Sequence, residues 1–508
     1  MYQAVGESDP MLGAVHNSPV ADPEKPGSTA GSGSIRTMRL EAPTRRCNDV
    51  LFAILFIANV LTVAVFAFWK GIPAVVKHAK AMMDDDGNDI AGPEEDGDYT
   101  KVFALSAALV AISIAVSAFW MRFLMAYATS LIRLALWLNV VVIVVFAIIS
   151  FSVQPIMSGI MLVGAGLNVW FIFAVRSRIA FAAANLKSAC AAVGEHMGVF
   201  WVALFMIIKQ FLWLMLWSLC AIGVYQHFKD VDPECDKAEA AHAPNAPSHF
   251  CGGTSAGLAM FFLLLSVYWG QQVIQNVLTC TTAGVVATWW YQPESDKVTF
   301  SAFYRSLTTS FGSICFGSLI VAVLHALRSM AALAKEKAAE DNNVALACVA
   351  CLAECVLGCI ERIMEYINQW AYVYVGIYGY DFRTSGKAVT DLFVNRGFTA
   401  VINDDLTQTA LTIGAFGVGF VGLVVGLLMV QFSPVGWFAA LGDKQSAFGV
   451  LGAIGFISGL GMAMVLANVI ITALHTVFVC FAEDPIALSR NHPHEYEILV
   501  GGWREMVK

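Results

Sequence analysis

The sequence predicts an all-α integral membrane protein with about ten transmembrane helices and with cytosolic N- and C-termini. Apolar residues make up 58% of the 508 residues and charged residues only 13%, whereas a soluble globular chain usually carries about 25% charged residues. The apolar residues form long runs, and a bilayer requires roughly 20 of them per spanning helix. Backbone polar groups inside a bilayer must be satisfied within the segment, so we expect these runs to be helical.

Ten apolar runs are candidates for membrane spans. Two of them lie inside helical patterns that are too long for one crossing, Ser255 to Tyr291 and Asn343 to Tyr380. At about 1.5 Å per residue the first would reach about 55 Å, so it either projects from the bilayer or bends. The predicted spans are residues 49–70, 102–124, 128–150, 155–175, 198–224, 255–279, 308–329, 345–364, 406–431 and 448–479.

Basic residues beside the spans indicate the orientation, because cytosolic loops are enriched in Lys and Arg. Arginines between Arg36 and Arg46 precede the first span, and the acidic loop 71–101 follows it. Basic residues mark alternate connections as far as the C-terminus, so both termini are expected in the cytosol. Three basic residues fall on the nominal outer side, where nearby acids offset them: Arg328, Lys335 and Lys337.

This pattern divides the chain into three parts. Residues 1–46 are rich in Gly, Ser, Pro and Ala and lack an apolar core, which is typical of a disordered tail. Residues 47–485 are expected to form the ten-helix transmembrane domain, with outer loops at 71–101 and 225–254. Residues 486–508 are expected to form a cytosolic C-terminal tail.

The cysteines suggest two structural roles. Cys235 and Cys251 are the pair in the second outer loop, where an oxidising exterior favours a disulfide worth about 3 kcal/mol; two unpaired thiols are the alternative. A stripe of four cysteines in the eighth span cannot surround zinc tetrahedrally from one straight helix, so we expect it to serve helix packing. The stripe consists of Cys348, Cys351, Cys355 and Cys359.

Two matches to enzyme motifs do not fit their context. Residues 253–257, GTSAG, match a nucleophile elbow but begin a membrane span instead of following a strand. Residues 417–422, GVGFVG, match a dinucleotide fingerprint but lie inside an apolar span. We therefore predict no enzyme, no cofactor and no metal site, and the lack of a basic stripe predicts no nucleic-acid partner. Small-residue spacing that lets membrane helices approach closely occurs at Gly422 and Gly426 and at Gly455 and Gly459.

Polar residues inside the spans need a partner or a cavity, because a charge at the bilayer centre costs about 2.5–3.5 kcal/mol. The ionisable ones are Lys209, His325, Glu354 and His475. Neutral ones give the sixth span a polar side and add one residue to the tenth: Gln271, Gln272, Gln275, Asn276 and Asn468. Interhelical hydrogen bonds of about 0.6 kcal/mol per pair explain any single one. A polar pathway through the bundle explains the set equally well.

An aromatic stripe runs through residues 365–382, EYINQWAYVYVGIYGYDF. Its rings are four residues apart, so a helix would place them on one face. A belt at the inner membrane interface is one interpretation, and recognition of a quaternary ammonium by ring faces is the other; composition alone favours the belt. The stripe consists of Tyr366, Trp370, Tyr374 and Tyr378.

Five segments resemble choline transporter-like proteins and occur in that family's order, covering the chain from about residue 45 to 485. The resemblance implies a ten-span solute carrier for choline, sometimes ethanolamine, that works without sodium and is often linked to proton antiport. The segments are RRCNDVLFAILF at the first span, CTTAGVVATWWY (280–291), SFGSICFGSLIVAVLHALR (310–328), AYVYVGIYGYDFRTSGKAV (371–389) and CFAEDP (480–485).

With this resemblance, roles can be assigned to the polar and aromatic residues. The central cation site is expected to combine Trp269, Gln271, Gln272, Gln275, Asn276 and Asn468. A cytosolic gate or exit is expected to be lined by Trp370, Tyr374 and Tyr378, with Tyr366 deepest. Proton coupling is expected from Glu354 and His475.

The chain departs from the family pattern in its short first outer loop and in Lys209. A fixed cation near the pathway would repel choline unless Lys209 pairs with an acid such as Glu354 or snorkels away; otherwise the substrate differs. We expect a multi-pass plasma-membrane protein whose partners are the bilayer and a small organic cation. A passive channel or lipid-handling protein on the same fold is the alternative, and the oligomeric state is open.

Overall fold

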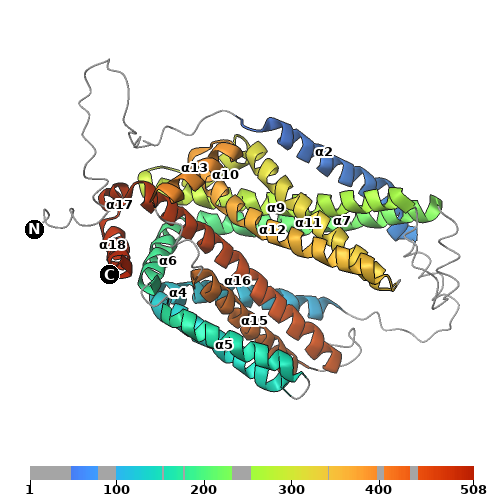
Figure 1. Ribbon diagram of the computed structural model, residues 1–508, viewed down its shortest axis with the longest axis horizontal. Helices are drawn as coiled ribbons and strands as arrows, with labels where there is room; N and C mark the ends of the chain where they lie inside the picture. The colour runs from blue at the N-terminus through green and yellow to red at the C-terminus, as the bar shows by residue number, and fades with distance from the viewer. Residues whose placement is uncertain are drawn as a thin grey trace, which may run out of the picture.

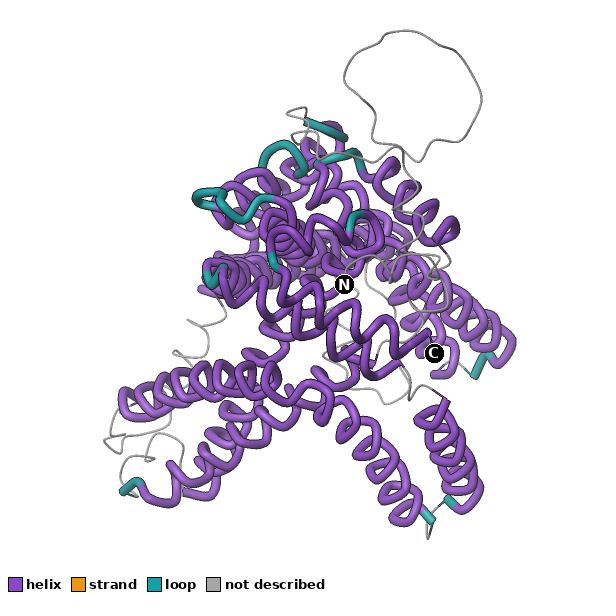
Figure 2. Tube along the Cα trace, turned by 90° about the vertical axis from the view of Figure 1, so that its left-hand side faces the viewer, coloured by secondary structure: helices purple, strands orange, loops and turns teal. Residues whose placement is uncertain are grey.

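The computed structural model describes residues 47–77, 99–151, 154–174, 178–231, 253–340, 342–396, 406–434 and 444–507. Every regular element in these ranges is a helix and none is a strand, which confirms the all-α prediction (Figures 1 and 2). Within them, 10 helices are long and apolar enough to cross a membrane, as the sequence predicts. The predicted tail 1–46 lies outside the described residues.

Helix α4 contains two of the spans, Ala104–Leu124 and Ser130–Ser150. A kink separates them, because the backbone leaves helical geometry at Tyr127 (φ −121°, ψ 26°). The membrane helices are α2 (Val50–Phe66), continued by the π-helical turn η1 (Ala67–Gly71), α4 (Tyr99–Ser150), α5 (Pro155–Ala174), α7 (Gly198–Val231), α9 (Gly253–Tyr291), α11 (Phe311–Glu340), α12 (Val344–Tyr378), α15 (Leu406–Phe432) and α16 (Lys444–Glu483). The shorter helices are α6 (Arg178–Glu195), α10 (Val298–Leu307), α13 (Phe382–Arg396), α17 (Pro485–Asn491) and α18 (Pro493–Val507).

Helices α9 and α12 are each continuous, with 39 and 35 residues. At about 1.5 Å per residue they reach roughly 58 and 52 Å, well beyond a hydrocarbon core of about 30 Å. Both long helical patterns therefore form single continuous helices that are longer than one direct crossing requires. The helical pattern predicted from Asn343 to Tyr380 is confirmed, since α12 continues through the aromatic stripe to Tyr378.

The membrane helices form two bundles (Figure 1). The α9 bundle contains α2, α7, α9, α11 and α12, and the α16 bundle contains α4, α5, α15 and α16. The bundles meet mainly where α16 packs against α9, with smaller contacts to α7 and α12. We call the end of the molecule that carries α6, α17 and α18 the junction end, and the opposite end, with the α11–α12 turn, the open end.

A buried apolar core holds the bundles together at the junction end. Trp290 at the end of α9 is fully buried and belongs to the same cluster as Val469, Val477 and Ala482 of α16. Helix α18 covers this core, because its Trp503 packs edge to face on an aromatic ring of α6, with 5.3 Å between ring centroids. The predicted C-terminal tail thus forms two helices that pack onto the membrane domain.

The contact between α15 and α16 brings two backbones together. A Cβ added at Gly422 would meet the carbonyl oxygen of Gly455, and one added at Gly455 would meet that of Gly422. At Gly426 and Gly459 a Cβ would also meet backbone oxygens of the facing helix. These positions confirm the predicted small-residue packing.

Substitution Gly422→Ala is expected to destabilise the protein by about 1–3 kcal/mol, because the added methyl group forces the two backbones apart. Gly417→Ala on the same helix is the matched control, since its methyl group would enter open space. Thermal unfolding of the purified protein in detergent is the measurement: Gly422→Ala should melt below the wild type and Gly417→Ala should not. Equal melting temperatures for the two variants would contradict this contact.

The cysteine stripe is not part of the packing. All four cysteines are exposed, so the predicted packing role is wrong. The reason is that α12 packs on its neighbours through the face that contains the buried Ala350 and Gly358, and the stripe lies outside that face. The stripe consists of Cys348, Cys351, Cys355 and Cys359. Cys235 and Cys251, the predicted disulfide pair, lie outside the described residues.

Candidate functional site

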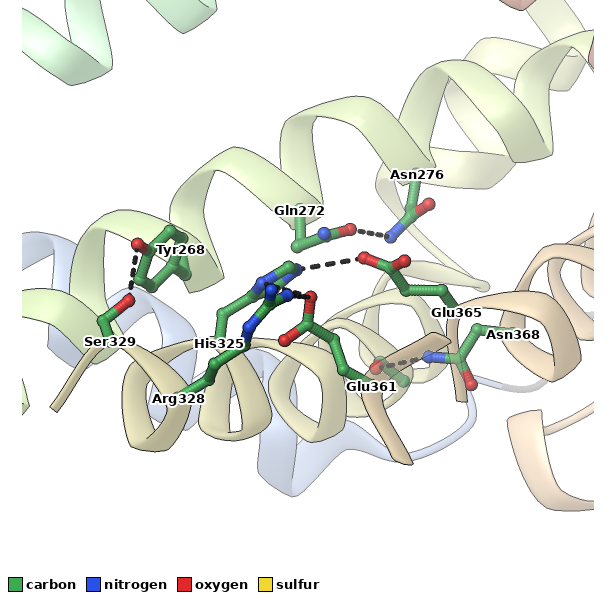
Figure 3. Close-up of polar contacts among 10 residues, drawn as sticks. Tyr268, Gln272, Asn276, His325, Arg328, Ser329, Glu361, Glu365 and Asn368 are labelled. Atoms are coloured by element: carbon green, nitrogen blue, oxygen red, sulfur yellow. Dashed lines mark hydrogen bonds and ion pairs between the residues drawn. The ribbon is translucent and has the colours of Figure 1, made fainter. Parts of the chain in front are cut away.

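Charged side chains of α11 and α12 meet inside the α9 bundle (Figure 3). His325 of α11 lies between two carboxylates of α12: its Nδ1 is 3.4 Å from Oε1 of Glu361, and its Nε2 is 3.1 Å from Oε1 of Glu365. Arg328 donates to the same Oε1 of Glu361 at 2.9 Å. We call His325, Glu361 and Glu365 the His–Glu cluster.

Helix spacing creates this cluster. Glu361 and Glu365 are four residues apart on α12, and His325 and Arg328 are three apart on α11, so each pair lies on one side of its helix. The two helices are neighbours in sequence and in space, joined by a short turn. Asn343 caps α12 at this turn by accepting a backbone N–H bond.

Glu361 is the buried charge of the site, with only 5% of its surface exposed. The side chains of Glu365 and Arg328 are 45% and 39% exposed. A buried charge requires paired partners, and Oε1 of Glu361 has two, whereas its Oε2 has no hydrogen-bond partner. Two carboxylates against one guanidinium give the site a net negative charge when His325 is neutral.

A groove on the open side leads to the cluster. The ring of His325 stacks on Tyr268 of α9 (5.1 Å between centroids, 27° between planes), and the Tyr268 hydroxyl bonds to Ser329 at 2.9 Å. Tyr268 and Ser329 also line a groove of about 720 Å³ between α9 and α11, whose charged lining residues are Lys335 and Glu336. The cluster is therefore one stacked ring away from this groove.

On the other side, a strip of hydrogen bonds joins α9, α11 and α12. Asn276 of α9 donates to Gln272 Oε1 at 3.4 Å and to Ser318 of α11 at 3.0 Å. The Ser318 hydroxyl bonds to that of Tyr372 on α12 at 3.1 Å, and Asn368 donates to a backbone carbonyl of α11 at 3.0 Å. The strip extends the cluster toward the junction end with polar groups that are mostly satisfied.

His475 of α16 marks the point where the second bundle meets α12. The side-chain amide of Gln369 donates to its Nδ1 at 3.0 Å, and Trp370 lies against its ring at 4.5 Å between centroids. His475 is 7% exposed. Since Glu365 is one helical turn before Gln369 on α12, the His–Glu cluster lies directly on the open side of the contact between the bundles.

Three of the predicted cation-site residues are inside the α9 bundle. Gln272 and Asn276 belong to the strip of hydrogen bonds. Trp269 is buried and donates its indole N–H to the carbonyl of Cys315 at 3.0 Å. Trp269 therefore joins α9 to α11 and presents no ring face to the groove.

The other three are exposed side chains. Gln271 and Gln275 are four residues apart and so lie on one side of α9. Asn468 precedes His475 by seven residues, or about two turns, and so lies on the face of α16 that meets α12.

The aromatic stripe crosses from an exposed to a buried environment. Tyr366 is 43% exposed, whereas Trp370, Tyr374 and Tyr378 are buried in the junction core. The hydroxyls of Tyr374 and Tyr378 both donate to the carboxylate of Glu483 on α16. A membrane-interface belt requires exposed rings, so that interpretation is wrong for these three residues, which instead join the two bundles.

Glu354 and Lys209 are not paired with each other. Glu354 forms an ion pair with Lys335 of α11 at 2.5 Å, about four helical turns before Gln369 on α12. Lys209 is exposed, and its Nζ lies 5.4 Å from the ring centroid of Phe205. The alternative in which Glu354 neutralises Lys209 is therefore wrong.

The sequence patterns do not indicate Glu361, Glu365 or Arg328 as site residues and give no role to His325. The predicted eighth span ends at residue 364, before Glu365, and Arg328 is interpreted as a basic residue on the nominal outer side. The sequence does contain a signal for this cluster. Glu361 and Glu365 are spaced by four on α12, and His325 and Arg328 are spaced by three on α11, the helix that directly precedes it. Two neighbouring helices with opposite charges at helical spacing can pair these side chains.

Ten apolar helices around a buried polar strip define a multi-pass α-helical membrane protein. Residues 159–486, more than half of the chain, match the family model described as "Plasma-membrane choline transporter". The chain belongs to this choline transporter-like family and is a membrane transporter. The predictions of the family and of a non-enzymatic function are thereby confirmed.

Similar proteins come from fungi and from an amoeba. Protein PNS1 of Cryptococcus neoformans is 28% identical over 470 residues, which cover 90% of this chain and 82% of the relative. Protein PNS1 of Mycosarcoma maydis is 29% identical over 346 residues (68% and 63%). A CTL-like protein of Dictyostelium discoideum is 26% identical over 409 residues (79% and 67%).

Proposed function

We propose that this chain carries choline, with ethanolamine as a second substrate, across the plasma membrane, independently of sodium and linked to protons. The observation that carries this proposal is the His–Glu cluster, which places net negative charge inside a membrane bundle beside a groove. A carboxylate that is buried inside a membrane bundle, as Glu361 is, has lost its hydrating water and favours a nearby cation. The description of the matching family supports choline as that cation.

Ring faces beside the cluster suit a quaternary ammonium, which has no N–H to donate. Tyr268 lies against His325 on the groove side. The trimethylammonium group would bind near Glu365 and these rings. The choline hydroxyl would bond to an exposed amide such as Gln271.

The proposed carrier alternates between two arrangements of its bundles. The junction core holds the bundles together at one end, and with both termini in the cytosol this end is the cytosolic one. The His–Glu cluster is then accessible from outside. Transport would require the open end to close and the contacts of His475 and Glu483 with α12 to separate.

We assign proton coupling to His475. Its Nδ1 accepts a hydrogen bond from the Gln369 amide, so protonation of Nδ1 would place two donors against each other. Protonation would thereby weaken the contact between the bundles and favour their separation. Glu354, the second residue expected to couple protons, is engaged by Lys335, and we propose no coupling role for it.

Substitution His475→Gln is expected to abolish the response of choline uptake to a proton gradient while uptake itself continues, because the Gln side chain has no ring nitrogen that can take up a proton. Initial uptake into proteoliposomes is measured with and without an imposed gradient. The exposed His494 of α18 provides the matched control, His494→Gln, and Glu354→Gln should also respond like the wild type. A gradient response that persists in His475→Gln would refute this assignment.

The proposed function is tested by uptake of radiolabelled choline into liposomes that contain the full chain, with ethanolamine as competitor and with sodium present or absent. Saturable uptake with trans-stimulation and no sodium requirement is expected of the carrier. A flux proportional to concentration would identify a channel on the same fold. The absence of flux with correctly inserted protein would overturn the choline assignment and leave lipid handling as the alternative.

A further inference from the structure

The His–Glu cluster also has the composition of a metal site. We propose that His325, Glu361 and Glu365 bind a divalent transition-metal ion of the Zn²⁺ class that enters from the open end. One ligand atom from each residue lies within 4.8 Å of the others. The separation of 3.1 Å between Nε2 of His325 and Oε1 of Glu365 is close to that between neighbouring ligands of a tetrahedral ion with bonds of about 2.0–2.1 Å.

The second oxygen of Glu361 is an independent indication of a ligand. Glu361 is 5% exposed, and its Oε2 has neither solvent contact nor a hydrogen-bond partner. Leaving a buried acceptor of this kind unsatisfied costs free energy. A metal ion bound by one carboxylate oxygen of Glu361, by Glu365 and by Nε2 of His325 would compensate the buried charge of Glu361 and keep a fourth position for water.

The neighbouring contacts would orient these ligands. A histidine that binds a metal commonly donates its second ring N–H to a carboxylate, and ligating carboxylates are themselves hydrogen-bonded. Here Nδ1 of His325 faces Oε1 of Glu361, and Arg328 donates to the same oxygen. This arrangement fixes the ring of His325 with Nε2 toward Glu365, while the positive charge of Arg328 lowers the affinity of the site for a cation.

The donor set selects the class of metal. One imidazole with two carboxylates suits Zn²⁺ and related transition ions, whereas Ca²⁺ and Mg²⁺ prefer oxygen ligands alone. Because the ion would occupy the carboxylates assigned to the organic cation, Zn²⁺ is expected to inhibit choline uptake competitively. This consequence rests on the proposed function, whereas metal binding itself does not.

The test is calorimetric titration of Zn²⁺ into the purified full chain in detergent. Glu365→Gln, a half-exposed isosteric change, and His325→Gln should each remove one site or weaken it at least tenfold, on the order of other changes around metal ligands. Glu294→Gln, an exposed change in the α9–α10 connection, should bind like the wild type. Titration with Co²⁺ should give the absorption bands of a tetrahedral ion in the wild type and lose them in His325→Gln.

The two proposals fail separately. Equal Zn²⁺ affinity in the wild type, Glu365→Gln and His325→Gln would overturn the metal site, whatever the uptake assay shows. Zn²⁺ binding that depends on these residues, in a protein that takes up no choline, would support the metal site and overturn the proposed substrate.

Discussion

Substitution Glu365→Gln is expected to lower kcat/KM for choline uptake by about tenfold or more. It removes the exposed carboxylate of the His–Glu cluster without changing the side-chain shape. Loss of one partner of a partly desolvated charge pair costs roughly 2 kcal/mol, and each 1.4 kcal/mol corresponds to a factor of ten. The measurement is the initial rate of uptake into proteoliposomes as a function of choline concentration.

A comparison of KM with kcat for choline uptake distinguishes weaker choline recognition from a loss of folded protein. Weaker recognition should appear as a raised KM for choline, with the same amount of folded protein per liposome as in the wild type. Glu294→Gln makes the same chemical change at an exposed position remote from the cluster and should leave both constants unchanged. An unaltered kcat/KM in Glu365→Gln would place the cation site elsewhere.

The double substitution Tyr374→Phe with Tyr378→Phe is expected to destabilise the junction end by at least about 3 kcal/mol. Both hydroxyls donate to Glu483, and a hydrogen bond to a charged group contributes about 1.5–3 kcal/mol. Either single change leaves the carboxylate one donor, so the double variant should lose more than the sum of the single losses. Thermal unfolding of the purified variants in detergent measures this.

Tyr304→Phe is the matched control for this experiment, because Tyr304 is 61% exposed on α10. It should melt with the wild type. If the double variant melts at the same temperature as Tyr304→Phe and the wild type, the hydrogen bonds to Glu483 do not hold α12 to α16.

The fold class could be predicted because hydrophobicity alone determines which segments enter a bilayer. Its limit is visible at α12: the predicted span ends at residue 364, whereas the helix continues to Tyr378. Aromatic residues such as Tyr372 and Tyr374 are less apolar than Leu on transfer scales, yet here they are buried between helices. Hydropathy measures how favourably a residue transfers into lipid. It does not measure whether a neighbouring helix buries that residue.

The site could be predicted only in part for the same reason. The polar side of the sixth span did indicate Gln272 and Asn276, because that pattern lies within one helix. The His–Glu cluster depends on how α11 faces α12, which no single-helix pattern reveals. The cysteine stripe shows the converse error, since small polarisable residues on one face suit helix packing but equally tolerate exposure.

The direct backbone contact between α15 and α16 also constrains how the molecule can move. No long side chain separates Gly422 from Gly455, so neither helix can roll or slide against the other without collision between main-chain atoms. Any separation of the bundles must therefore move α15 and α16 together as one rigid body. Distances between probes on these two helices should stay constant through a transport cycle, while distances from either helix to α12 change.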